Sequence, residues 1–170
     1  MKIFIPGEMK DKGFTSLMPS EVKKLVKMGV NVEVEKGIGK TCDISDDEYI
    51  EAGSKIVSDR FAGYQSADLI LRRYKPSKAE VQCLKKGCVH VSFLDPYNEK
   101  ELVRAMAEQG VTALAMEMIP RTTIAQKMDA LSSQSNLAGY AAVVLAAGHI
   151  GRIFPMMMTA AGTISPSRVL

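Results

Sequence analysis

The chain has 170 residues, of which 46% are hydrophobic and 24% are charged. This is an ordinary globular balance with enough material for a sizeable core. The net charge of +3 is small and the basic residues are scattered, which argues against a nucleic-acid-binding protein. The three cysteines form no CxxC pair and the N-terminus lacks a signal-peptide pattern, which indicates reduced thiols in a cytosolic setting. The apolar stretch at 153–161 is shorter than the roughly 20 residues that span a bilayer, so we expect a soluble chain without a transmembrane segment.

Two alternating patterns run through the first 116 residues. Short apolar, β-branched runs predict strands over residues 2–6, 31–35, 68–72, 89–93 and 112–116. Amphipathic segments between them predict helices over residues 19–28, 45–52, 77–86 and 98–109. Ser20 is the expected cap of the first helix and Gly29 its expected end. Strands that alternate with helices predict an α/β fold, with a parallel sheet flanked by helices as in Rossmann or flavodoxin-like lobes.

The pattern changes after residue 118. Small residues such as Ala138 and Gly139 predict a long helix, and Pro155 bends or ends whatever precedes it. No strand is evident from residue 132 onward until 168–170, which resembles the start of one. The methionines at 156–158 are interpreted as core filling. We therefore expect a domain boundary near residue 130, with an N-terminal α/β lobe at 1–130 and a connecting helix that begins a second lobe at 131–170.

Few residues are candidates for acid–base, nucleophilic or metal chemistry. Gly39-Lys40-Thr41 lacks the glycine spacing of a phosphate-binding loop. His90 alternates within an apolar strand and is interpreted as a core histidine. His90 and His149 lack carboxylates at metal-ligand spacing, so no metal site is predicted.

A polar cluster at residues 121–133 has two interpretations. If a helix begins after Thr123, then Thr123 and Gln126 form a capping box, which is a structural role. The same helix places Gln126, Asp129 and Ser133 on one solvated face, with Arg121 just before it. Such a cluster also matches a carboxamide ligand, because the carboxylate accepts from its NH2 group and the guanidinium donates to its oxygen.

A resemblance to a known family favours the second interpretation. The chain resembles the NAD(H)-binding alpha subunit of proton-translocating NAD(P) transhydrogenases, a family that shares its fold with alanine dehydrogenase. The resemblance rests on Arg121-x4-Gln126-x2-Asp129-x2-Ser132, SQSNLAGY at 133–140, FPMMMTAAGT at 154–163, MKIFIPGE at the start, PSEVKKLVKMG at 19–29 and AMEMIPR at 115–121.

The resemblance implies a role for each residue of the motif. Arg121, Gln126 and Asp129 would act in catalysis and, together with Ser132, would bind the nicotinamide end of NAD(H). They would position it for hydride transfer to NADP(H) on a partner domain. The implied assembly is a homodimer with NADP-binding and membrane-embedded subunits that couple the reaction to proton translocation. Its implied location is the cytoplasmic face of the inner membrane, where this subunit is peripheral.

Two alternatives remain open. One is an alanine dehydrogenase-like oxidoreductase, although that enzyme's substrate-binding arginine and lysine correspond here to Phe14 and Tyr74; Arg72 and Arg73 are conceivable substitutes. The other is a non-catalytic remnant that serves as an oligomerisation module. The sequence contains no GxGxxG turn, and the resemblance assigns that turn to a following NAD-binding Rossmann lobe. We therefore expect the 170-residue chain by itself to be inactive.

Overall fold

The computed structural model describes residues 1–8 and 14–168. The chain divides into two compact units, Met1–Pro120 and Arg121–Leu170. The division falls earlier than the expected boundary near residue 130. The reason is that the polar segment after Pro120 makes its hydrogen bonds within itself and with the start of the following helix, as between Asp129 and Ser132.

The described part of the first unit contains a six-stranded parallel sheet in the order β3-β2-β1-β4-β5-β6. The strands are β1 (Lys2–Ile5), β2 (Asn31–Glu35), β3 (Lys55–Val57), β4 (Leu69–Leu71), β5 (Val89–Ser92) and β6 (Thr112–Ala115). The predicted strands and the parallel sheet are confirmed. β3 was not predicted, because three residues are too few to give a strand period. The strand order reverses between β1 and β4: β2 and β3 are added on one side of β1, and β4, β5 and β6 on the other. The position between β1 and β4 is therefore the topological switch point.

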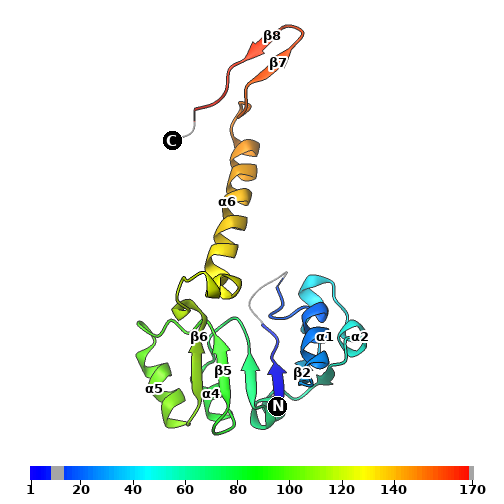
Figure 1. Cartoon of the computed structure of the whole chain (residues 1–170), viewed down its shortest axis with the longest axis vertical. Helices are drawn as coiled ribbons and strands as arrows, with labels where there is room; N and C mark the ends of the chain where they lie inside the picture. Colours follow the sequence, from blue (N-terminus) through cyan, green and yellow to red (C-terminus); the bar gives the residue numbers. More distant parts are fainter. Residues whose placement is uncertain (9–13, 169–170) are drawn as a thin grey trace. The chain divides into compact units, whose positions relative to one another are not determined.

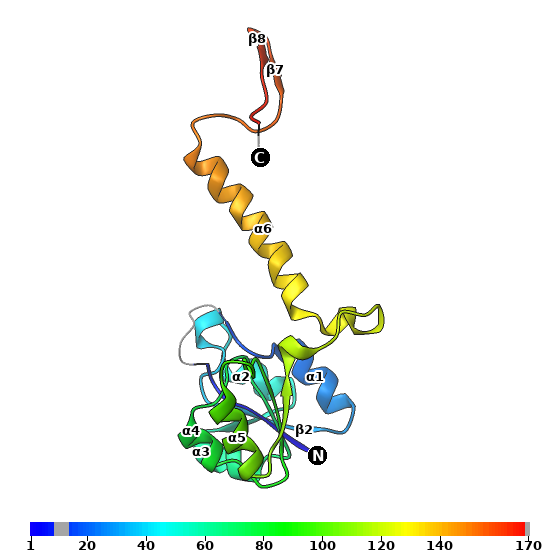
Figure 2. The ribbon, with the colours of Figure 1, turned by 90° about the vertical axis from the view of Figure 1, so that its left-hand side faces the viewer.

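Helices cover both faces of this sheet, as expected (Figures 1 and 2). One face packs against α1 (Pro19–Lys27) and α2 (Asp46–Glu51), and the other packs against α3 (Arg60–Ser66), α4 (Lys78–Gln82) and α5 (Lys100–Glu108). Two buried clusters separate the layers. Val22 and Tyr49 belong to the first cluster, and Tyr64, Val81 and Leu102 belong to the second. Short 3-10 turns occur at η1 (Lys40–Cys42) and η2 (Met116–Met118).

The helix ends differ most from prediction at the start of α1 and the end of α4. Ser20 is not the cap of α1, because the cap is Met18, which makes no side-chain capping bond, and Pro19 begins the helix. Proline fits there since its missing N–H would have no helical partner. α4 ends at Gln82 rather than near residue 86. Gly29 follows α1 with φ of +81°, which agrees with the expected stop.

The second unit begins with η3 (Ile124–Met128) and continues into α6 (Ala130–His149), β7 (Met157–Thr159) and β8 (Gly162–Ile164). The predicted long helix is confirmed by α6 (Figure 1). The expectation of no strand here was wrong, because β7 and β8 form an antiparallel hairpin. Met156, Met157 and Met158 are exposed rather than core residues. Of the expected strand at 168–170, Arg168 is not in a strand, and Val169 and Leu170 lie outside the described residues.

Within the described ranges, no helix combines the length and the apolar character needed to cross a bilayer. α6 is long enough to be considered for such a role, but it carries Ser132, Ser133, Gln134, Ser135 and Asn136 in its first two turns.

Candidate functional site

The predicted site residues of the second unit line one concavity. It has a volume of about 450 Å³ and is bounded by Arg121, Thr122, Thr123, Gln126, Asp129, Ser132 and Ser133. Residues 121–129 form the loop and η3, and Ser132 and Ser133 come from the first turn of α6. The fold therefore brings together the four residues that the resemblance singled out, along with three hydroxyl side chains beside them.

The capping box predicted for Thr123 and Gln126 is absent from this segment. The helix does not begin after Thr123: residues Ile124–Met128 form a 3-10 turn, and Thr123 makes no side-chain capping bond. Instead, the backbone N–H of Ala125 donates to the carbonyl oxygen of Thr122 at 3.0 Å and to its Oγ1 at 3.4 Å. The structural interpretation of Gln126 as a capping residue was wrong.

Asp129 is the N-terminal cap of α6. Its Oδ1 accepts from the backbone N–H of Ser132 at 3.0 Å, and its Oδ2 accepts from the Ser132 hydroxyl at 2.6 Å. Ser133 donates its hydroxyl to the backbone carbonyl of Asp129 at 3.1 Å. The pKa of the Asp129 carboxyl is lowered chiefly by the hydrogen bond from the Ser132 hydroxyl. The hydrogen bond from the Ser132 N–H and the positive charge of Arg121 lower it further. The carboxylate is therefore ionised and held in one orientation at the helix start.

The donors and acceptors of the concavity complement a primary amide. Within residues 1–8 and 14–168, the side chains of Arg121 and Gln126 make no hydrogen bond with the chain. Their N–H groups can therefore donate to a ligand carbonyl, while Asp129 is an acceptor for a ligand NH2 group. Arg121 and Gln126 are exposed, so a ligand can reach them.

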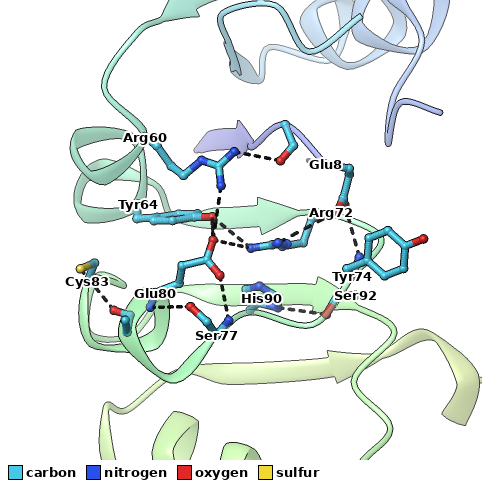
Figure 3. A network of polar contacts seen from close by, with 12 residues as sticks. Glu8, Arg60, Tyr64, Arg72, Tyr74, Ser77, Glu80, Cys83, His90 and Ser92 are labelled. Atoms are coloured by element: carbon cyan, nitrogen blue, oxygen red, sulfur yellow. Dashed lines mark hydrogen bonds and ion pairs between the residues drawn. The ribbon is translucent and has the colours of Figure 1, made fainter. Parts of the chain in front are cut away.

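A second polar cluster lies in the first unit and was not predicted. Arg72, directly after β4, donates to Glu80 Oε1 at 3.1 Å and to the Tyr64 hydroxyl at 3.0 Å (Figure 3). Arg60 donates to Glu35 at 2.9 Å and lies 3.6 Å from Glu80. Burial alone would raise the pKa of Glu80, but the Ser77 backbone N–H and the Arg72 guanidinium lower it to about 2. The two arginines are therefore already neutralised by carboxylates of the same unit.

This cluster borders a cavity of about 530 Å³ at the switch point of the sheet. Glu8, which follows β1, accepts from the backbone N–H groups of Arg73 and Tyr74, which follow β4. Figure 3 shows the bond from Tyr74. The Glu8 side chain is only 2% exposed. No local motif marks these residues, because strand order alone brings the ends of β1 and β4 together. Only a prediction of the strand order, and from it of the switch point, could have located these residues.

Comparison with known proteins places the chain in a family. The alanine dehydrogenase/PNT N-terminal domain matches residues 4–138. The chain is 43% identical over 176 residues to an NAD(P) transhydrogenase alpha-subunit protein of Rhodospirillum rubrum, an alignment that covers 100% of this chain and 46% of that protein. The chain thus spans about half the length of the curated relatives it matches.

Solved structures give the same result. A transhydrogenase from Sinorhizobium meliloti superposes with a TM-score of 0.85 and 43% identity, covering 98% of this chain and 50% of that one. An L-alanine dehydrogenase superposes with a TM-score of 0.65 and 28% identity, covering 70% of this chain and 33% of that one. These matches confirm the family resemblance drawn from the motifs, and the chain belongs to the alanine dehydrogenase/PNT family through its N-terminal domain.

Proposed function

We propose that this chain is the N-terminal part of the NAD(H)-binding component of a transhydrogenase, which transfers hydride between NADH and NADP+. The observation that carries the proposal is the concavity in which Arg121, Gln126, Asp129 and Ser132 meet. The identity of 43% to a transhydrogenase alpha subunit along the whole chain supports it.

The residues of the concavity fit the carboxamide of a nicotinamide. Arg121 and Gln126 would donate to its carbonyl oxygen, and Asp129 would accept from its NH2 group. Two donors and one acceptor fixed around a planar amide define both the position and the rotation of the ring to which it is attached. NAD(H), when bound, supplies the transferable hydride.

The work left to the protein is orientation. Hydride transfer between two nicotinamides needs no nucleophile and no general acid or base, because the cofactors carry the chemistry. This agrees with a concavity that contains a guanidinium, an amide, a carboxylate and hydroxyls but no histidine or cysteine. The main contribution of Arg121, Gln126 and Asp129 would be to hold the reacting carbon at the correct distance and angle.

The wider assembly belongs to the same proposal. NADP(H) would bind on a partner domain, and membrane-embedded subunits would couple the transfer to proton translocation. The pyrophosphate and adenosine of NAD(H) would bind to a Rossmann lobe for which residues 131–170 form the connection. The chain would act as a homodimer, peripheral to the membrane through its partners.

The alanine dehydrogenase-like alternative is less well supported by the first unit. Arg72 is buried and paired with Glu80 at 3.1 Å, so it is not available to a substrate carboxylate. The Arg73 guanidinium lies 4.3 Å from the centre of the Phe14 ring and 5.0 Å from that of the Tyr74 ring. Two aromatic rings thus flank this arginine at the positions that correspond to the substrate-binding arginine and lysine of alanine dehydrogenases.

The test is to separate cofactor binding from hydride transfer in the complete protein. Gln126→Ala and Asp129→Ala should slow transfer from NADH by up to about 10²-fold, because a misplacement of roughly 1 Å has that effect. The dissociation constant for NADH, measured by calorimetry, should change far less, since phosphate and ribose contacts supply most dinucleotide affinity. Gln134→Ala, on exposed α6 but outside the concavity, is the matched control. Parental transfer rates in both site variants would refute the proposal.

A further inference from the structure

No further inference is drawn: the strongest candidate, the cavity of about 530 Å³ at the switch point of the sheet in the first unit, carries none, because the guanidinium groups of Arg60 and Arg72 on its wall are already paired with carboxylates of the same unit and nothing in the described part of the chain shows what would occupy it.

Discussion

At the scale of single residues, burial and a nearby opposite charge act in opposite directions on the pKa values of Glu80 and His90 in the first unit. His90 is fully buried on β5, with Nδ1 3.4 Å from the Ser92 hydroxyl and Nε2 without a hydrogen-bond partner in the described part of the chain. Desolvation, followed by the positive charge of Arg72, lowers the pKa of His90 to about 4, although Glu80 acts in the opposite direction. The interpretation as a core histidine is confirmed by its burial, which favours the neutral form of the imidazole.

This burial predicts a loss of stability in mild acid. As pH falls below the ordinary His90 value of 6.5, the unfolded chain binds a proton that the folded chain does not bind until about pH 4. The stability present above pH 6.5 is therefore lost progressively over this window, by up to roughly 3 kcal/mol. Urea unfolding at several pH values between 7 and 5 should give a flatter dependence for His90→Asn than for the parent.

A second variant separates this histidine from the neighbouring carboxyl. The lowered pKa of Glu80 means that its contribution is present above its ordinary value of 4.5 and is lost as pH falls towards 2. Glu80→Gln should therefore leave the slope between pH 6.5 and 5 unchanged. Equal slopes for His90→Asn and the parent in that range would contradict the assignment.

At the scale of secondary-structure elements, α3 is a helix whose position depends on tertiary packing. It was not predicted, because Gly63 in its centre weakens the helical pattern. Asp59 caps it by accepting from the backbone N–H groups of Phe61 and Ala62. The glycine is required by packing: a Cβ at residue 63 would lie 2.5 Å from Cζ of Phe4, a fully buried ring on β1. α3 can approach the sheet only because that side chain is missing.

Gly63→Ala should therefore destabilise the first unit by about 1–3 kcal/mol, the usual cost of overpacking a core. This outweighs the gain of roughly 1 kcal/mol that alanine brings to a helix interior, because Phe4 is enclosed and cannot move away. Chemical denaturation measures the change. Combining it with Phe4→Leu, which removes the contacting ring atoms, should give a loss smaller than the sum of the two single losses. An unchanged denaturation midpoint for Gly63→Ala would disprove the close contact.

At the scale of the whole molecule, the second unit exposes an unusual amount of apolar surface. On α6, the exposed fractions of Leu137, Tyr140, Val143, Val144 and Leu145 lie between 53% and 74%. Apolar residues occur on all sides of this helix beyond its first turns, and such a surface is normally covered. This agrees with the proposed homodimer, in which residues 139–161 would contribute to the subunit interface.

Sedimentation at micromolar concentration should accordingly detect a dimer or larger assembly of the 170-residue chain. Val144→Arg, in the proposed interface, should shift the population towards the monomer, because a charge buried at an interface without a partner is costly. Met28→Arg, at a residue that is 76% exposed in the first unit, should leave association unchanged. A parent chain that sediments as a clean monomer would refute the interface.

Much of the fold follows from the sequence alone. Apolar, β-branched runs located β1, β2, β4, β5 and β6, and their alternation with helices gave the parallel sheet. The concavity was also foreseeable, because Arg121, Gln126, Asp129 and Ser132 lie within twelve consecutive positions of the chain. Contacts between residues three or four apart depend mainly on local backbone geometry. The cap was misassigned to Thr123 instead of Asp129, since both residue types satisfy the same capping pattern.

The tertiary structure alone decided the features that join distant parts of the chain. Glu8 reaches the backbone of Arg73 across a separation of 65 residues, and Arg72 and Glu80 meet Arg60 and Tyr64 only after α3 and α4 have packed on the same face of the sheet. The sequence around each of these residues is compatible with a solvated surface position. Strand order determines which loops lie side by side at the carboxyl edge of the sheet, and burial then requires each charge there to find a partner.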